Sequence, residues 1–278
     1  MLSATHRISE RKRRKMELIE SYTLSKSGIE EYNEDGMYFK YPFAAVIDGT
    51  TSKGEREING MTCGRFAMQT LITALDTANP DLEPFGLISW LNQCLKKKLE
   101  EESAEGSAGI VLYNAKRREL IVYGDNFYRI DGKTYKTSKK GDVKSAKKRA
   151  KIIKRYLTKG YTVESIQKAD PGRTAIIDDI KDYAHRYANR RVKNGYAVLS
   201  GQEVVKELLK VHKIAQGTQI ILASDGYPIL KETLAETENM LSKALSKDVL
   251  CIKELLGTKG VAFGNISFDD RTYLRFKT

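Results

Sequence analysis

The chain has 278 residues and a formal net charge of +12 at pH 7. This length is enough to bury one large core, and no run approaches the roughly 18 to 20 apolar residues that a membrane span requires. The three cysteines and three histidines are scattered, without a Cys-x-x-Cys or His-x-x-x-His pair, which argues against a structural zinc site. We therefore expect a cytoplasmic, monomeric protein with reduced thiols and no membrane span.

The positive charge is concentrated in two segments. Between Lys133 and Lys159, twelve Lys or Arg stand against one acid, a net +11, and residues 1–15 carry a net +5. The remainder of the chain is therefore mildly acidic, at −4. Basic runs of this kind are usually solvated surface, and binding of an acidic partner or of nucleic acid is the alternative.

The first 130 residues contain strand patterns and helix patterns in turn. Residues 20–48 have the pattern of short strands separated by polar turns. Residues 60–78 and 84–102 place apolar side chains at helical spacing, which predicts two amphipathic helices packed on a sheet. Three apolar runs joined by short polar turns then predict an antiparallel meander: 107–113, 120–123 and 127–130.

A basic segment interrupts this series of strands. Residues 142–195 have a mostly helical pattern, with a break at Pro171. We interpret the segment at about 133–195 as an inserted cap or flap. It belongs to a single domain at 16–278, which follows a basic arm at 1–15.

The last third of the chain predicts helices around one strand and a second strand at its end. The helix patterns lie near 202–212, 230–245 and 248–256, and the first strand contains Ile220. Strands in two clusters with helices between them predict an α+β fold with layered sheets.

Four acidic positions stand beside apolar runs that have the pattern of buried strands: Asp48, Asp125, Asp225 and Asp269. A short buried strand that ends in a carboxylate presents it at the edge of a sheet, where several strands can bring their acids together. Clustered carboxylates repel one another unless a cation neutralises them. The sequence therefore predicts a site for a hard metal ion.

A fifth acidic position and the order of the motifs carry a family resemblance. From about residue 20 to 278 the chain resembles the metal-dependent protein serine/threonine phosphatases of type 2C. The matching fragments, in the family's order, are Asn33-Glu34-Asp35, Val46-Ile47-Asp48-Gly49, Gly106-Ser107, Gly124-Asp125, Ala223-Ser224-Asp225-Gly226 and Asp269-Asp270-x-Thr272.

The resemblance implies a fold and the residues that bind the second of two metal ions. The fold would be a sandwich of two antiparallel sheets flanked by helices, with the site at one end and the basic helical cap inserted. Asp48 would bridge two Mg²⁺ or Mn²⁺ ions, and the carbonyl of Gly49 would bind one of them. Glu34 would complete the protein ligands of the second ion.

The resemblance also implies the ligands of the other ions. Asp225 and Asp269 would hold the first ion and, with Asp48, would be the catalytic acids. Asp125 matches the position that helps to bind a third ion in some members. A one-residue shift to Asp35 or Asp270 stays open, as does the reading of each Asp-Gly pair as an ordinary turn.

The ligand chemistry supports the same kind of site. Oxygen ligands suit Mg²⁺ or Mn²⁺, and a site without His or Cys disfavours zinc and copper. Two such ions roughly 3.5 to 4 Å apart would share a water and lower its pKa from about 15.7 towards about 7. The bridging hydroxide would then attack phosphorus directly, without a phosphoenzyme.

Two positions depart from the family pattern. Many members carry an Arg shortly before the residue that matches Glu34, and many carry a His where this chain has Thr50. Candidates for the missing positive charge at the substrate phosphate are Lys26, Lys53 and Arg56. We interpret His185 and His212 as surface or packing residues.

Three functions follow from these patterns. The first is a phosphatase for phosphoserine and phosphothreonine in proteins. The second is a catalytically weak phosphatase-like regulator that binds phosphorylated partners, suggested by the missing Arg and His. The third is a nucleic-acid-binding protein that uses its basic segments.

Overall fold

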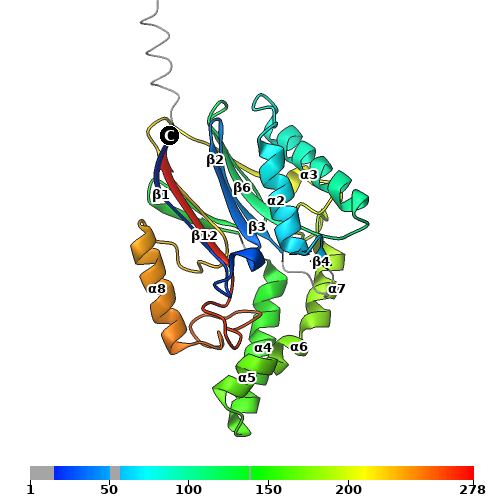
Figure 1. Cartoon of the computed structure of the whole chain (residues 1–278), viewed down its shortest axis with the longest axis vertical. Helices are drawn as coiled ribbons and strands as arrows, with labels where there is room; N and C mark the ends of the chain where they lie inside the picture. The colour runs from blue at the N-terminus through cyan, green and yellow to red at the C-terminus, as the bar shows by residue number, and fades with distance from the viewer. Residues whose placement is uncertain (1–15, 51–56, 138) are drawn as a thin grey trace, which may run out of the picture.

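The computed structural model describes residues 16–50, 57–137 and 139–278. In this part of the chain two five-stranded antiparallel sheets pack face to face, and helices cover both outer faces (Figure 1). This arrangement confirms the α+β sandwich that the sequence predicted. The basic arm predicted at 1–15 lies outside the described residues.

Strand order in each sheet differs from chain order. The first sheet contains β1 (Glu17–Leu24), β12 (Arg271–Lys277), β11 (Gln219–Ala223), β8 (Phe127–Ile130) and β9 (Lys133–Lys136). The second contains β10 (Lys210–Lys213), β7 (Glu119–Tyr123), β6 (Ala108–Asn114), β3 (Phe43–Gly49) and β2 (Asp35–Lys40). A short helical turn, η1 (Glu30–Tyr32), lies between β1 and β2, and β4 (Glu57–Ile58) pairs with β5 (Met61–Thr62) in a small hairpin.

Alternating side chains in β3 contribute to two separate cores. Ala44 and Val46 belong to the core between the sheets, together with Leu222 and Leu274 from the first sheet. Ile47 points the other way and packs in the core under the helices. Because successive strand residues face opposite sides, the next inward position after Val46 falls at the carboxyl end of the strand.

Three helices close the outer faces of the sandwich. α2 (Cys63–Leu75) and α3 (Pro84–Glu101) cover the second sheet, and α8 (Leu234–Lys247) covers the first. α3 begins with a proline, and α8 begins with a capping box formed by Thr233 and Glu236. These helices confirm the amphipathic segments predicted in the same parts of the sequence. Among the described helices, none combines the length and apolarity needed to cross a membrane.

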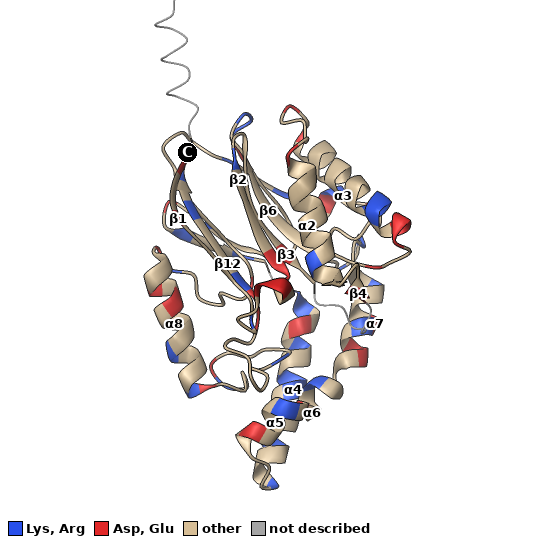
Figure 2. Cartoon of the chain, in the orientation of Figure 1, with Lys and Arg blue, Asp and Glu red and all other residues tan. Residues whose placement is uncertain are grey.

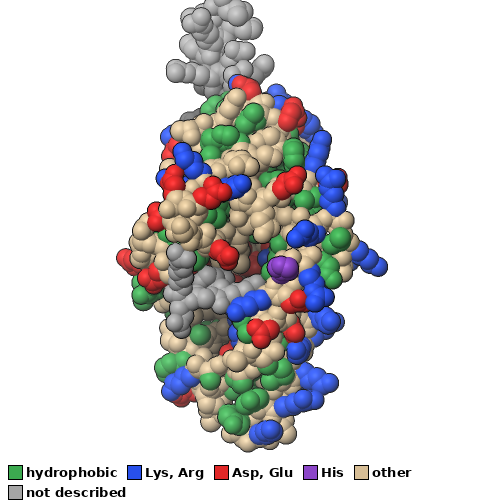
Figure 3. Space-filling view, turned by 90° about the vertical axis from the view of Figure 1, so that its right-hand side faces the viewer, with side chains coloured by type: hydrophobic (Ala, Val, Ile, Leu, Met, Phe, Trp, Pro, Cys, Tyr) green, Lys and Arg blue, Asp and Glu red, His purple; other side chains and the backbone are tan. Residues whose placement is uncertain are grey.

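Four further helices form a cap beyond one end of the sandwich (Figure 1). They are α4 (Lys140–Thr158), α5 (Val163–Ala169), α6 (Pro171–Thr174) and α7 (Ile177–Tyr187). Lys and Arg residues follow one another along α4 (Figure 2), and they also gather along one edge of the face that carries α3 and α7 (Figure 3). The helical character predicted for this segment is confirmed, whereas the proposed domain boundaries stay predictions.

Arg149 fastens the cap to the body of the protein. Its side chain is fully buried in α4. The guanidinium donates hydrogen bonds to Asp170 at 2.8 Å, and to the carbonyl oxygens of Leu250 at 2.8 Å and Gly257 at 3.3 Å. Ile153 packs beside it in an apolar cluster with Leu250. One buried side chain therefore links α4 to the start of α6 and to the loop before β12.

The predicted meander is wrong at its third strand. β6 and β7 pair antiparallel, but β8 pairs with β11 in the other sheet. The chain leaves the second sheet at Gly124, whose φ is +145° and where a Cβ would lie 2.3 Å from the Cα of Gly109. Glycine is needed for this close crossing. Turn chemistry alone does not reveal which sheet the next strand joins.

Two predicted helices are also wrong. Segment 202–212 contains a short turn, η2 (Lys206–Leu208), followed by β10, which extends the second sheet by pairing with β7. Segment 248–256 is irregular because the carboxylate of Asp248 accepts hydrogen bonds from three following amides, those of Ile252, Lys253 and Leu255. A side chain that captures these amides competes with the helical hydrogen-bond pattern.

Candidate active site

Three acidic residues meet at the end of the sandwich that the cap covers, where Figure 2 shows acidic positions at the end of β3 above α4. Asp48 continues the inward-facing side of β3, and Asp35, the first residue of β2, lies directly opposite it in the register. Asp225 follows the end of β11, and its amide nitrogen lies 3.5 Å from Oδ2 of Asp48. We call Asp35, Asp48 and Asp225 the central acids.

Glycines beside two of these segments permit close approach of the backbones. A Cβ on Gly49 would lie 2.3 Å from the carbonyl oxygen of Gly64 and 2.5 Å from that of Glu34. A Cβ on Gly226 would lie 1.9 Å from the carbonyl oxygen of Asp270. Asp48 and Gly49 both belong to β3, so the glycine serves close packing at a strand end. Both Asp-Gly pairs thus help to draw the acid-bearing segments together.

Burial and mutual repulsion disfavour the charged form of each central acid. Burial, followed by repulsion from Asp225 and Asp35, raises the pKa of Asp48. Burial and then Asp270 raise the pKa of Asp35, and burial with repulsion from Asp269 raises the pKa of Asp225 to about 7. None of the three forms an ion pair within 4.0 Å with a described Lys, Arg or His. A nearby cation would relieve this repulsion.

Two acids at the margin of the cluster have lysine partners. Lys139 Nζ lies 3.5 Å from Asp125 Oδ2, and Lys259 Nζ lies 2.6 Å from Asp269 Oδ1. Burial raises the pKa of Asp125, although Lys139 opposes the shift. The sequence predicted both acids as metal ligands, and the structure places both beside the central acids with an ammonium group on each.

Glu34 and Asp270 share a third lysine. Lys26 Nζ lies 3.1 Å from Glu34 Oε2 and 2.8 Å from Asp270 Oδ2. Glu34 also packs against Gly64, where a Cβ would lie 2.6 Å from its Oε1. The structure therefore directs Glu34 toward Lys26 and α2, whereas the adjacent Asp35 lies opposite Asp48. Which neighbour of this pair binds an ion remains a prediction.

A small cavity of about 140 Å³ connects the acids with the cap. Its floor includes Asp48 and Asp225, and Gly49 and Asp269 also line it. Its other walls come from the cap and the segments around it, and they include Lys139, Asp142, Arg173, Ile180, Tyr183, Tyr196 and Lys259. Cationic groups thus face an acidic floor across a space large enough for a small charged group.

Sequence reasoning did not identify the cations Lys139, Arg173 and Lys259. Lys139 is one of many lysines in its segment, and no local pattern marks it as the one that reaches the acids. In the structure Asp125 and Asp142 raise its pKa even though burial alone would lower it, so the ammonium stays charged at neutral pH. Its Nζ also lies 5.2 Å from the ring centre of Tyr196.

The residues suggested for phosphate contact are placed elsewhere. Lys26 is engaged by Glu34 and Asp270, and it is not among the residues that line the cavity. Lys53 and Arg56 lie outside the described residues. His185 is exposed on α7, and Nε2 of His212 in β10 lies 2.8 Å from the hydroxyl oxygen of Tyr128.

The donor set fits a hard divalent cation. Among the described residues, no three His, Cys, Asp or Glu side chains lie close enough to hold an ion as they stand. However, Oδ2 of Asp35 is buried and accepts no hydrogen bond from the described part of the chain. An oxygen-only cluster with raised pKa values, which a cation would lower, matches the preferences of Mg²⁺ and Mn²⁺.

Comparison with known proteins gives similarity of fold. No family model and no curated protein matches the sequence. The catalytic domain of the serine/threonine phosphatase PstP in complex with two manganese ions is 16% identical, with 95% of this chain and 99% of that chain covered and a TM-score of 0.48. The phosphatase Stp1 from Staphylococcus aureus is 12% identical over 93% and 94%, with a TM-score of 0.48. The phosphatase MsPP from Mycobacterium smegmatis, in complex with cacodylate, is 17% identical over 94% and 99%, with a TM-score of 0.46.

Proposed function

We propose that this chain is a divalent-metal-dependent phosphatase that hydrolyses phosphoserine or phosphothreonine in proteins. The observation that carries the proposal is the convergence of Asp35, Asp48 and Asp225, with raised pKa values, below a cationic wall. Acids that repel one another beside lysines and an arginine suit a reaction that needs both a bound cation and a bound phosphate.

Mg²⁺ or Mn²⁺ would be held by a set of oxygen ligands around the central acids. The sequence proposes Glu34, Asp48, the carbonyl of Gly49, Asp125, Asp225 and Asp269, and we include Asp35, the alternative to Glu34, because it lies opposite Asp48. When bound, the metal would supply Lewis acidity toward the phosphoryl oxygens and a water acidic enough to attack phosphorus at neutral pH. Ions at Asp125 or Asp269 would share the carboxylate with Lys139 or Lys259.

The cap provides the positive charge that the sequence lacks before Glu34. Lys139 and Arg173 line the cavity opposite Asp48, and we assign the binding of the substrate phosphate to these two side chains. Charge-assisted hydrogen bonds from ammonium and guanidinium groups are well suited to phosphate oxygens. Tyr183 and Tyr196 also line the cavity.

Metal-dependent turnover tests the proposal. Hydrolysis of p-nitrophenyl phosphate and of a phosphoserine peptide should require Mn²⁺ or Mg²⁺ in the wild type. Asp48→Asn and Asp225→Asn should each lose more than about 100-fold of that activity, because each removes a ligand. Asp81→Asn, an exposed acid paired with Lys116, is the control and should retain full activity. Unchanged turnover in both site variants rejects the proposal.

A catalytically weak regulator is the second candidate function. The observation in its favour is that Lys139 and Lys259 already neutralise two of the proposed ligands, Asp125 and Asp269. This function predicts Mn²⁺ binding by calorimetry and binding of a phosphopeptide without its hydrolysis. Ordinary turnover of the same peptide excludes it.

A further inference from the structure

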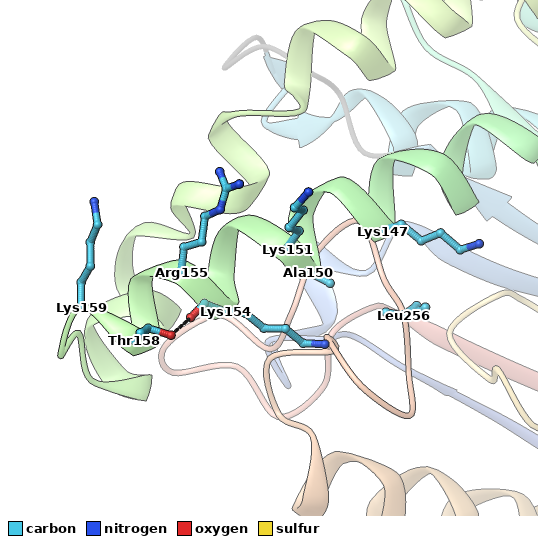
Figure 4. Close-up of a pocket in the computed structure, with 8 residues that line it drawn as sticks. All are labelled: Lys147, Ala150, Lys151, Lys154, Arg155, Thr158, Lys159 and Leu256. Carbon is cyan, nitrogen blue, oxygen red and sulfur yellow. Dashed lines mark hydrogen bonds between the residues drawn. The ribbon is translucent and has the colours of Figure 1, made fainter.

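Three neighbouring hollows follow one another from the active-site cavity along α4. The cavity shares Asp125, Lys139 and Asp225 with a second hollow of about 340 Å³, which extends to Leu256. Leu256 also lines a third hollow of about 650 Å³ on the outer half of α4 (Figure 4). We call this third hollow the basic groove.

The basic groove combines an apolar floor with a cationic rim. Its lining consists of Ala150, Thr158 and Leu256 together with five basic residues: Lys147, Lys151, Lys154, Arg155 and Lys159. The side chains of Lys151, Arg155 and Lys159 point to one side of α4, whereas those of Lys147 and Lys154 extend on the side of Leu256 (Figure 4). Their aliphatic stems cover the helix while the charged ends stay in water.

The positive charge of the groove is not compensated by the described residues. All five basic side chains are exposed, and none has a described carboxylate within 4.0 Å. By contrast, the neighbouring Lys148 on the same helix pairs with Asp179 at 2.6 Å. Five uncompensated cations from Lys147 to the C-cap of α4 create a potential that attracts an acidic ligand.

We propose that the basic groove binds an acidic segment of the polypeptide whose phosphorylated residue enters the cavity. This proposal rests on the proposed function, because it requires the phosphorylated residue of the substrate polypeptide to bind beside Lys139. Two observations favour a polypeptide over nucleic acid. The groove adjoins, at Leu256, the second hollow, which shares lining residues with the cavity, and the lining of the groove contains no aromatic side chain on which bases could stack.

The helix geometry gives the spacing of the acidic residues in the ligand. At a rise of about 1.5 Å per residue, Lys147 lies about 12 Å and Arg155 about 24 Å along the helix from Lys139. An extended peptide covers about 3.3 Å per residue. Acidic residues about four to seven positions from the phosphorylated residue would therefore reach the groove.

Binding of an unphosphorylated acidic peptide tests the groove without any catalysis. A fluorescein-labelled peptide of eight glutamates is titrated with the full chain at low salt and followed by fluorescence anisotropy. The double variant Lys151→Glu/Arg155→Glu should weaken binding about 10-fold, because it reverses two of the five charges. The control Lys243→Glu/Lys247→Glu changes the net charge equally, at exposed positions with the same spacing on α8, and should bind like the wild type.

Three results of this titration overturn the proposal. Equal weakening in both double variants shows a net-charge effect only. Wild-type binding in the groove variant shows that the peptide binds elsewhere. A 20-nucleotide oligo-dT that binds more tightly than the peptide, and loses this affinity in the groove variant alone, identifies nucleic acid as the occupant.

Hydrolysis of two phosphopeptides separates the groove from the proposed function. One peptide carries glutamates four to seven positions from the phosphoserine, and its partner carries serines there. The groove variant should raise the KM of the acidic peptide about 10-fold and leave the serine peptide and p-nitrophenyl phosphate unchanged. If the wild type hydrolyses none of the three, the proposed function fails and the anisotropy titration alone decides the groove.

Discussion

The floor and the roof of the cavity are built in opposite ways. The floor contains Asp48 and Asp225 near strand ends, and the register of β2 and β3 places the third central acid, Asp35, opposite Asp48. The roof consists of cations on helices and loops of the cap, such as Lys139 and Arg173. The floor acids repel one another, whereas the cap cation Lys139 has an acid as its partner. On the proposed function, the sandwich would provide the metal ligands and the cap the groups that contact the substrate.

The largest expected effect is on stability, when the contacts that attach the cap to the sandwich are removed. Arg149→Met removes a fully buried guanidinium and leaves Asp170 and the carbonyl oxygens of Leu250 and Gly257 without their donor. We expect the free energy of unfolding to fall by about 3–5 kcal/mol, as for other broken buried ion pairs. Urea unfolding followed by fluorescence measures this loss.

The control for this experiment is Arg155→Met on the exposed face of the same helix. Its effect should stay within about 0.5 kcal/mol, as for most surface substitutions. If the two variants lose equal stability, Arg149 does not fasten the cap in the way that its contacts indicate.

The floor can be tested at the two neighbouring acids whose roles the sequence left open. Asp35→Asn should weaken Mn²⁺ binding about 10- to 100-fold in a calorimetric titration, because Asp35 lies opposite Asp48. Glu34→Gln should have a smaller effect, since Lys26 already binds Glu34 in the structure. A larger loss in Glu34→Gln would instead support Glu34 as the direct ligand that the sequence predicted.

The roof is tested at Lys139, which we assign to the substrate phosphate. Lys139→Met should raise the KM for p-nitrophenyl phosphate about 10-fold, the typical cost of a lost hydrogen bond to a charged group. The kcat at saturating substrate should change less, because the floor acids are retained. Lys140→Met, at the adjacent exposed position, is the control. An equal change of KM in both variants argues against a specific role of Lys139.

The two halves of the cavity also differ in how far the sequence could predict them. Asp48 was predictable because a buried strand leads into it, and alternation along that strand fixes which side its carboxylate takes. The role of Lys139 was not predictable, because it depends on the position of the cap relative to the acids of the floor. The helix expected after Asp248 failed for a related reason, since a single carboxylate captured the amides that a helix needs. Local patterns therefore give the strand ends that carry the acids and the helical character of the cap. Tertiary contacts decide which sheet β8 and β10 join and which cap side chains face the cavity.

The smallest expected effect concerns pH and compares a histidine of the sandwich with one of the cap. His212 in β10 lies within hydrogen-bonding distance of the Tyr128 hydroxyl and against the ring of Tyr135. Its pKa is lowered by burial and by the charges of Lys210 and Lys133.

The lowered pKa of His212 fixes the sign of its contribution to stability. Below the unfolded pKa of about 6.5, the unfolded chain takes up a proton more readily than the folded one. The free energy of unfolding should therefore fall as the pH decreases from about 7.5 to 5, and His212→Gln should reduce this fall. Urea unfolding at both pH values provides the measurement. His185→Gln, on the exposed side of α7, should keep the pH dependence of the wild type, and an equal change in both variants would show that the contacts of His212 do not determine it.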